Sequence, residues 1–425
     1  MAMPIAPPFV TMRTEIAGIP VARLAEQFGT PVFVYDAAWM LRRLEDLRRF
    51  DCVRYAMKAC SNLAVLDLLR RHGAMVDCVS AGEVRRALRA GYPAQGDPPP
   101  IVYTADIFDR EALALVVEQK IHINCGSPDM IRQYGQLDPG REITLRINPG
   151  FGHGHHLKTN TGGERSKHGI WHEQLPECLE EAARFGLRVT GLHMHIGSGT
   201  DLEHLAQVCG AMEKAVLQAG PDIRSISGGG GLPIPYTPQQ QYVDLEEYYR
   251  LWDSTRQRLQ QALGHPIRLE IEPGRFLVAE AGYLITEIRA VKQQGNFTFY
   301  LVDAGFNNLA RPILYGAYHP ISICPADGED VNRPEIEAIV GGPLCESGDI
   351  FTQQEGGLVT PRWLPKAQVG DWLIIERAGA YGFVMGSNYN SKPLAAEVLI
   401  HEGQARLIRR RQTFDDMIRE EILPE

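Results

Sequence analysis

The sequence lacks the features that mark membrane, secreted and repeat proteins. Its longest apolar runs fall far short of the ~18 residues that a membrane-spanning helix needs. No basic segment followed by an apolar core stands at the start, so we expect no secretory signal and a cytoplasmic location. The absence of internal repeats and of low-complexity segments excludes a solenoid and a largely disordered chain.

Paired cysteines are also missing. The cysteines are scattered between Cys52 and Cys345, and no two of them form a CxxC motif. This pattern excludes a disulfide framework and a zinc ribbon, and most of these thiols are expected to be small buried apolar groups. The sequence HGHH at 153–156 has no carboxylate or cysteine at ligand spacing, so we expect no metal site.

Positive charge is not in excess. Lys and Arg total 43 against 52 Asp and Glu, which gives a net charge of −9. The only strongly basic stretch is RLIRRRQ at 406–412, and a short run of this kind is usually a solvated surface. We therefore do not expect nucleic acid as the main partner, and the short apolar runs noted above give no reason to expect a membrane.

What the sequence does contain is a regular alternation of strand and helix patterns. Amphipathic helical stretches lie at 62–73, 81–91, 111–119 and 175–186. Short β-branched runs that end in turn residues lie at 53–58, 75–80, 101–106, 121–127, 143–150, 189–198, 222–231 and 267–274. Eight strands alternating with helices predict a (β/α)8 barrel, since a doubly wound sheet usually has fewer strands.

After residue 283 the pattern changes to strands with glycine-rich turns and no long helices. These strands are expected at 283–294, 297–305, 334–342, 371–379 and 395–411. They predict a C-terminal antiparallel β-barrel or sandwich domain, which PVFVYD at 31–36 could extend by one strand. The predicted division is 1–36 as a segment packing with the β domain, 37–282 as the barrel and 283–425 as the β domain.

Residues suited to catalysis or cofactor binding cluster where the predicted barrel strands end. Active sites of such barrels lie at the carboxyl ends of the strands, with phosphate bound after strands seven and eight. Here those two loops carry GGGG at 228–231 and the sequence EPGR with Glu272 and Arg275. The first strand ends in Lys58, and the sixth is followed by His195. A phosphate loop, a lysine, a carboxylate and an imidazole on one face together fit pyridoxal 5'-phosphate.

Each of these signals alone has an ordinary structural explanation. A single strand-end lysine is more often a surface or ion-paired residue, and a glycine run alone is only a turn. A histidine in a barrel is more often a hydrogen-bonded core residue. The four together, at one face of the predicted barrel, favour a cofactor site.

Longer motifs make the chain resemble a known family. They are YAMKACSNLAVLDLL around Lys58, GHGHHLKTNTGGERSKHGI (152–170), HMHIGSG, GGGLPIPY, EPGRFLVAEAG, VDAGFNNLARPILYGAYH (302–319), GPLCESGDIF (342–351) and GAYGFVMGSNYNSKP (379–393). Over nearly its whole length the chain resembles the fold-type III pyridoxal phosphate-dependent decarboxylases, and within them the diaminopimelate decarboxylase family. The resemblance implies decarboxylation of meso-2,6-diaminopimelate to L-lysine, the last step of lysine biosynthesis.

The resemblance also implies a role for individual residues. Lys58 matches the Schiff-base lysine and Cys345 the proton donor. The positions that match cofactor contacts are Lys58, His195, Ser198, Gly231, Glu272, Pro273, Gly274, Arg275 and Tyr381. Those that match substrate contacts are Arg275, Arg311, Tyr315, Glu346 and Tyr381. Arginine suits this purpose because its guanidinium group binds a carboxylate through two parallel hydrogen bonds.

The resemblance further implies a homodimer whose active site lies at the subunit interface. Two alternatives stay open at this stage. One is a decarboxylase of ornithine, arginine or carboxynorspermidine on the same fold. The other is a catalytically dead regulator, which the intact Lys58, Cys345 and Glu272 disfavour.

Overall fold

The computed structural model describes residues 7–152, 162–195, 197, 201–328 and 330–424. The chain divides into two units. Among the described residues, the first comprises 41–233 and 242–276, and the second comprises 7–40, Ile234–Gln241 and 277–424. The short excursion of Ile234–Gln241 into the second unit had no signal in the sequence.

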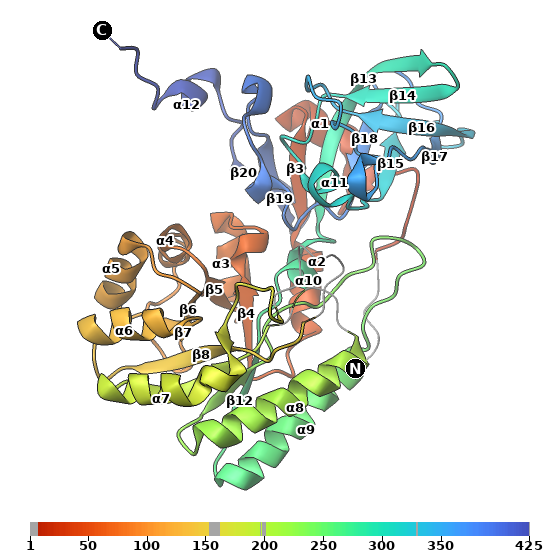
Figure 1. Ribbon diagram of the computed structural model, residues 1–425. Coiled ribbons are helices and arrows are strands. Elements are labelled where there is room, and N and C mark those ends of the chain that lie inside the picture. The colour runs from red at the N-terminus through yellow and green to blue at the C-terminus, as the bar shows by residue number, and fades with distance from the viewer. Residues whose placement is uncertain (1–6, 153–161, 196, 198–200, 329, 425) are drawn as a thin grey trace. The chain divides into compact units, whose positions relative to one another are not determined.

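The first unit is a closed barrel of eight parallel strands (Figure 1). The strands are β4 (Cys52–Ala56), β5 (Met75–Cys78), β6 (Ile101–Ala105), β7 (His122–Cys125), β8 (Glu142–Asn148), β10 (Arg188–His193), β11 (Ser225–Ser227) and β12 (Arg268–Ile271). β12 pairs with β4, and β10 pairs with both β8 and β11, which closes the ring. The short β9 (Ile170–Trp171) adds to β8. The predicted (β/α)8 fold is confirmed, and each of its eight strands corresponds to a predicted run.

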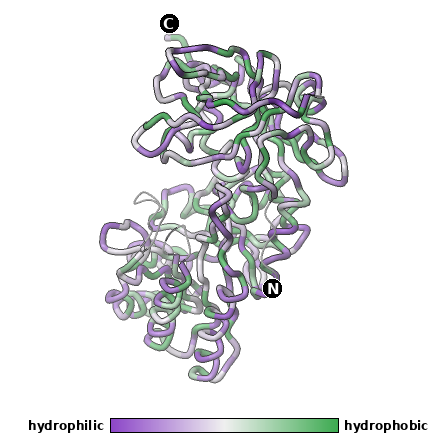
Figure 2. Tube along the Cα trace, turned by 90° about the vertical axis from the view of Figure 1, so that its right-hand side faces the viewer, coloured by the Kyte–Doolittle hydropathy of each residue, from purple (hydrophilic) through white to green (hydrophobic). Residues whose placement is uncertain are grey.

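Helices follow the barrel strands. They are α3 (Leu63–Arg71), α4 (Ala81–Arg89), α5 (Arg110–Gln119), α6 (Pro128–Leu137), α7 (Leu175–Arg184), α8 (Leu202–Ala219), α9 (Leu245–Leu263) and α10 (Arg275–Val278), with the 3-10 turns η1 (Met57–Ala59) and η3 (His172–Gln174). Most begin at a side-chain cap; the Ser80 hydroxyl, for example, accepts the Glu83 N–H at the start of α4. Hydropathy alternates along these helices, as expected where one face packs on the sheet (Figure 2).

The second unit is built around a long bent sheet. Its strand order is β17-β16-β14-β13-β3-β19-β20, and β18 pairs with both β13 and β15. The strands are β3 (Val32–Asp36), β13 (Gly282–Gln294), β14 (Phe297–Val302), β15 (Ile321–Cys324), β16 (Glu335–Gly341), β17 (Arg362–Pro365), β18 (Trp372–Ile375), β19 (Ala396–His401) and β20 (Gln404–Arg409). The β domain predicted from the sequence is confirmed, but its sheet is mixed, since β14–β16 and β3–β19 are parallel pairs.

Smaller elements complete the second unit. They are β1 (Glu15–Ile16), β2 (Ile19–Pro20), α1 (Val21–Phe28), α11 (Arg311–Tyr315), α12 (Phe414–Ile418) and the 3-10 turns η4 (Glu355–Gly357), η5 (Phe383–Met385) and η6 (Tyr389–Ser391); α2 (Ala37–Glu45) leads from this unit into the barrel. α1 packs its buried Val21, Leu24 and Ala25 into a core with Val34 and Ile285 of the sheet. Among the described residues, none of the helices combines the length and apolarity needed to span a bilayer.

Candidate active site

Lys58 lies immediately after the first barrel strand, in the turn η1, where its side chain is exposed. The turn packs against the loop after the last strand, because the Ala56 N–H donates to the Pro273 carbonyl over 3.2 Å. A Cβ on Gly274 would stand 3.1 Å from the Ala56 carbonyl oxygen, so this position is tight for any other residue. Strands β4 and β12 thus bring Lys58 and the EPGR sequence to the same end of the barrel.

Two buried carboxyl groups at this end have opposite pKa shifts. Burial and the neighbouring Glu272 charge raise the pKa of Asp77 well above its usual range, against the opposing effect of Lys58. Burial also acts on Glu272, but His193, Arg54 and Arg146 outweigh it, and the pKa of Glu272 is lowered. Burial therefore disfavours charge on Asp77, whereas the neighbours of Glu272 favour its charged form.

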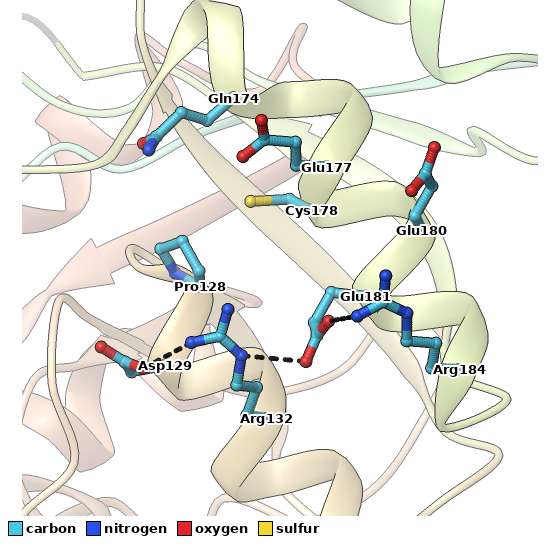
Figure 3. A pocket seen from close by; sticks show the side chains of 9 residues that line it. All are labelled: Pro128, Asp129, Arg132, Gln174, Glu177, Cys178, Glu180, Glu181 and Arg184. Atoms are coloured by element: carbon cyan, nitrogen blue, oxygen red, sulfur yellow. Dashed lines mark hydrogen bonds and ion pairs between the residues drawn. The ribbon is translucent and has the colours of Figure 1, made fainter.

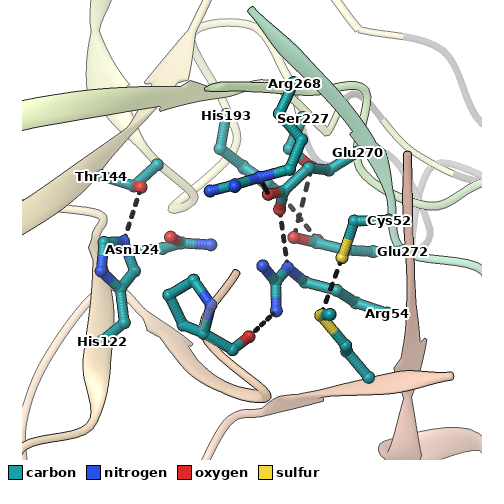
Figure 4. A network of polar contacts seen from close by, with 12 residues as sticks. Cys52, Arg54, His122, Asn124, Thr144, His193, Ser227, Arg268, Glu270 and Glu272 are labelled. Carbon is teal, nitrogen blue, oxygen red and sulfur yellow. Dashed lines mark hydrogen bonds and ion pairs between the residues drawn. The ribbon is translucent and has the colours of Figure 1, made fainter. Parts of the chain in front are cut away.

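Glu272 is held from two sides inside the barrel (Figure 4). The imidazole Nε2 of His193 lies 2.7 Å from Glu272 Oε2, and the hydroxyl of Ser227 donates to Oε1 over 3.3 Å. Deeper in the barrel, Arg54 Nε donates to Glu270 over 2.7 Å. These contacts hold the Glu272 carboxylate in place and favour its charged form.

His195 follows β10 by two residues and is partly buried. Burial, reinforced by the positive charges of Arg146 and Lys58, lowers its pKa well below 6.5. The ring is therefore neutral near pH 7, as suits an imidazole that stacks on an aromatic ligand.

The four glycines after β11 are each enforced by a different neighbour. A Cβ on Gly228 would come within 2.8 Å of the Trp252 ring. A Cβ on Gly229 would lie 2.6 Å from the Cβ of His195. On Gly230 it would lie 2.6 Å from the Glu272 carbonyl oxygen, and on Gly231 it would lie 2.3 Å from the Gly197 carbonyl oxygen. Gly229 and Gly231 also have positive φ. The result is a side-chain-free backbone loop of the kind that cradles phosphate.

These features together fit pyridoxal phosphate. The loop after β11 offers backbone N–H groups, Lys58 offers an amine and Glu272 a fixed carboxylate. Two buried polar atoms of the site, Asp77 Oδ1 and His193 Nδ1, have no hydrogen-bond partner among the described residues. Such atoms in a native protein usually face a ligand or ordered water. Arg275, which begins α10, adds a partly buried cation.

In the second unit, Arg311 and Tyr315 lie on one short helix, α11. Pro312 stands in its first turn, and Gly316 ends it with φ of +59°, where a Cβ would lie 2.0 Å from the backbone nitrogen of Glu355. Arg311 is buried, and Tyr315 is partly exposed. The Nη1 group of Arg311 donates to the Tyr236 hydroxyl over 3.2 Å.

Cys345 and Glu346 are exposed in a loop of the second unit that begins after β16. The buried carboxylate of Asp349 organises this loop, accepting the N–H groups of Leu344 at 2.8 Å and Phe306 at 2.7 Å. The Cys345 N–H donates to Asn390 Oδ1 over 2.7 Å. This hydrogen bond joins the CESGD loop to the SNYNS segment and leaves the Cys345 thiol exposed.

Tyr381 has φ of +58°, an unusual conformation for a residue with a side chain. Two residues earlier, the backbone at Gly379 passes close to the backbone at Val278. A Cβ on Gly379 would lie 1.9 Å from the Val278 carbonyl oxygen, so only glycine fits there. The Tyr381 ring remains partly exposed. Such a backbone, imposed by its surroundings, is common for residues that contact ligands.

Some predicted positions lie outside the described residues. They are Ser198 and the HGHH segment at 153–156. Within the described part of the chain, no group of three or more His, Cys, Asp or Glu side chains is arranged to hold a metal ion.

Sequence reasoning missed several residues that hold the predicted site residues in place. His193, which lies in the motif HMHIGSG, had no signal that marked it as the partner of Glu272. Asp349 and His319 had no local signal as organising residues, because their contacts come from distant segments. His168 Nδ1 lies 2.6 Å from Asp106 Oδ2, and this pair was not anticipated either. The signals that could have raised interest were the alternation of His193 with His195 and the acidic end of CESGD.

A surface hollow lies elsewhere on the barrel, between α6 and α7 (Figure 3). Its arginines are paired, with Arg132 Nε donating to Glu181 over 2.9 Å and Arg184 Nη1 donating to Glu181 over 2.7 Å. The hollow is on the outer helices rather than at the carboxyl ends of the strands. We therefore do not assign it to the active site.

Comparisons with known proteins agree with this geometry. Residues 40–279 match the family described as pyridoxal-dependent decarboxylase, pyridoxal binding domain. Diaminopimelate decarboxylase of Escherichia coli (strain K12) is 54% identical over 411 residues, covering 96% of this chain and 98% of the relative. A crystal structure of diaminopimelate decarboxylase, 54% identical, superposes with a TM-score of 0.92 and covers 95% and 96% of the two chains. The Helicobacter pylori enzyme complexed with L-lysine is 30% identical, with a TM-score of 0.81 and coverage of 93% and 98%.

Proposed function

This chain belongs to the pyridoxal-dependent decarboxylases, and from that premise we propose that it converts meso-2,6-diaminopimelate to L-lysine and CO2. The observation that carries the proposal is the 54% identity to a diaminopimelate decarboxylase over 96% of this chain. The reaction would complete lysine biosynthesis. The proposal includes a cytoplasmic location.

We propose that the cofactor is held by the residues that the family resemblance assigns to it. Lys58 would bind its aldehyde covalently, and the backbone at Gly231 with Ser198 and the turn at 273–275 would bind its phosphate. Glu272 would contact the pyridine nitrogen, His195 the ring face, and Tyr381 a further edge. When bound, pyridoxal phosphate supplies an electron sink for the electrons left behind by a departing carboxylate.

The protein groups that would support this chemistry have suitable charges. The ionised Glu272, buried and hydrogen-bonded to His193, favours a proton on any basic nitrogen that it contacts. The neutral His195 ring adds no positive charge against an aromatic ligand. Burial raises the pKa of the Asp77 carboxyl, and so it disfavours a second buried negative charge beside Glu272.

Substrate recognition is proposed for Arg275, Arg311, Tyr315, Glu346 and Tyr381. Guanidinium groups would hold carboxylates, and Glu346 would contact an amine of the substrate. Cys345 would donate its thiol proton to the carbon that loses CO2, leaving a thiolate that regains a proton from solvent. Cys345 is exposed, so its thiol can contact a substrate. The hydrogen bond from its N–H to Asn390 holds its backbone in place.

We also propose a homodimer with the active site at its interface. In such a two-fold assembly, Lys58, His195 and Arg275 would come from one subunit and Cys345 with Glu346 from the other. The support is the family resemblance and the exposure of Cys345 and Glu346 in the isolated chain.

The test is a comparison of substrates. Purified enzyme with added pyridoxal phosphate is incubated with meso-diaminopimelate, ornithine and arginine in parallel, and CO2 release and product identity are measured. We expect release from meso-diaminopimelate alone, with L-lysine as product. Preferential release from ornithine or arginine would favour the alternative amino acid decarboxylases, and no release from any of the three would favour a regulator of the same fold.

A further inference from the structure

His319 is a buried histidine of the second unit, with 2% of its surface exposed. It follows α11 by four residues, so it belongs to the segment that carries Arg311. Its two ring nitrogens contact different partners. Nε2 lies 3.0 Å from Arg311 Nη1, and Nδ1 lies 3.1 Å from the backbone carbonyl oxygen of Glu376.

These two contacts fix the protonation of the ring. A guanidinium group has only hydrogens to offer, so Nε2 must accept with its lone pair. A carbonyl oxygen only accepts, so Nδ1 must carry the proton. His319 is therefore a neutral imidazole with its hydrogen on Nδ1, and it connects Arg311 to the backbone.

The backbone at the far end of this connection is itself anchored. The Glu376 N–H donates to the Pro320 carbonyl over 2.8 Å. The Glu376 carboxylate accepts hydrogen bonds from Ser322 Oγ and from Arg13 Nε, each at 2.7 Å. His319 thus links the guanidinium group of Arg311 to the backbone directly after β18, and that backbone is itself held by these hydrogen bonds.

Arg311 Nη1 carries two hydrogens, and each has a partner. One is directed to His319 Nε2 and the other to the hydroxyl of Tyr236 over 3.2 Å. The Tyr236 ring also packs edge-on against the His319 ring, at 5.4 Å between centroids. These two bonds fix the orientation of the planar guanidinium group, which a bidentate contact to a carboxylate requires.

We propose that His319 is a positioning residue that orients Arg311 toward the substrate carboxylate that is not removed. The inference rests on the proposed function, in which Arg311 binds a substrate carboxylate. His319 would thereby determine the preference for amino acids with a second carboxylate, without touching the substrate. If His319 had only a structural role, its bond to the Glu376 carbonyl would matter, and loss of the acceptor for Arg311 would have no effect on substrate binding.

Two substitutions separate these roles. His319→Gln places its carboxamide about where Nε2 lies and keeps an acceptor for Arg311. His319→Asn reaches about as far as Nδ1, so it keeps the donor to Glu376 and loses the acceptor. Tyr236→Phe removes the other acceptor of Nη1 and serves as a second, independent variant. His401→Gln, at the end of β19, is the matched control for loss of a histidine elsewhere in the same unit.

The readout is binding to the holoenzyme, measured by calorimetry with L-lysine and with cadaverine, which is lysine without its carboxylate. We expect His319→Asn to weaken lysine binding by about 10-fold or more, because a hydrogen bond to a charged group is lost, and to leave cadaverine binding unchanged. His319→Gln should recover most of the lysine affinity. Tyr236→Phe should weaken lysine binding in the same selective way. The KM for meso-diaminopimelate should rise in parallel, with the cofactor absorbance unchanged.

Several outcomes would overturn the inference. They are equal weakening of lysine and cadaverine, weaker lysine binding in His319→Gln than in His319→Asn, and unchanged binding in both. A wild-type holoenzyme that binds lysine no better than cadaverine would also contradict it. Failure of the proposed function would look different, since the wild-type enzyme would then release no CO2 from meso-diaminopimelate whatever the binding contrast.

Discussion

The imidazole of His193 and the carboxylate of Glu272 form a buried hydrogen-bonded pair, with 2.7 Å between Nε2 and Oε2 and exposed fractions of 1% and 6%. The two residues stand at the ends of β10 and β12, on either side of β11 in the barrel. A carboxylate at this depth is costly unless it is paired, so His193 is what allows Glu272 to remain charged.

The first prediction concerns this pair. His193→Leu should lower the free energy of unfolding by about 2–4 kcal/mol, because it leaves a buried carboxylate without its main donor. It should also reduce kcat, since the pKa of Glu272 would rise. His193→Gln, which keeps a donor near Nε2, should recover part of both. Chemical denaturation and rate measurements at several pH values check this, and a His193→Leu protein of wild-type stability and rate would contradict it.

The second prediction concerns Lys58. Holoenzyme should show the visible absorbance of lysine-bound pyridoxal, and Lys58→Ala should abolish both this band and activity. Lys214→Ala, an exposed lysine of α8, is the control and should keep both. Borohydride reduction followed by peptide mapping identifies the modified residue. A reduced adduct on another lysine would show that Lys58 is the wrong choice.

The third prediction concerns Arg311. Arg311→Ala should raise the KM for meso-diaminopimelate by about 30-fold or more, because a charge-assisted contact in a buried site is lost. The cofactor absorbance should stay as in the wild type. Arg289→Ala, an exposed arginine of β13, should leave the KM unchanged. Steady-state kinetics decide the question, and an unaltered KM in Arg311→Ala would remove this residue from the substrate site.

The fourth prediction tests the shared site of the proposed dimer. Lys58→Ala and Cys345→Ala homodimers should each be nearly inactive. After mixing and subunit exchange, half of the dimers combine one subunit of each kind, and each of these has one complete site. Activity should return to about a quarter of the wild-type value, by counting sites in a two-fold dimer. If mass spectrometry confirms exchange and no activity appears, both residues act within one chain.

The fifth prediction concerns His122, at the start of β7. Burial and the positive charges of Arg54 and Arg268 lower the pKa of His122 to about 4. Between pH ~6.5 and about 4 the unfolded chain binds a proton that the folded chain does not, so stability falls as the pH falls through this range. The change amounts to up to about 3 kcal/mol, at about 1.4 kcal/mol for each pH unit.

The measurement for His122 is urea denaturation of the wild type and of His122→Gln across this pH range. The substitution keeps a polar group near Thr144, whose hydroxyl lies 2.9 Å from His122 Nε2. The variant should lose less stability on acidification than the wild type, while His401→Gln should follow the wild type. Parallel curves for the wild type and His122→Gln would contradict the assignment.

Much of the fold could be read from the sequence because its signals are local. Parallel barrel strands are buried on both faces, so they stand out as short β-branched runs, and all eight could be located. The long helices α8 and α9 were not among the predicted stretches, and neither was the excursion of Ile234–Gln241. The second sheet was expected to be antiparallel, but strand direction depends on which distant segments pair, as β3 does with β19.

The sequence by itself determined which chemical groups reach the carboxyl ends of the barrel strands. Lys58, Glu272 and the glycine run are placed there by the alternation of strands and helices, since parallel strands all end at the same face. Only the tertiary structure decided the state of those groups. Glu272 owes its charge to His193, 79 residues away, and Gly231 is required by the carbonyl of Gly197. In the second unit, His319 accepts a hydrogen bond from Arg311 and donates one to the backbone carbonyl of Glu376, 57 positions away. Protonation and orientation depend on burial and on partners brought together by folding, and no local pattern of residues encodes either one.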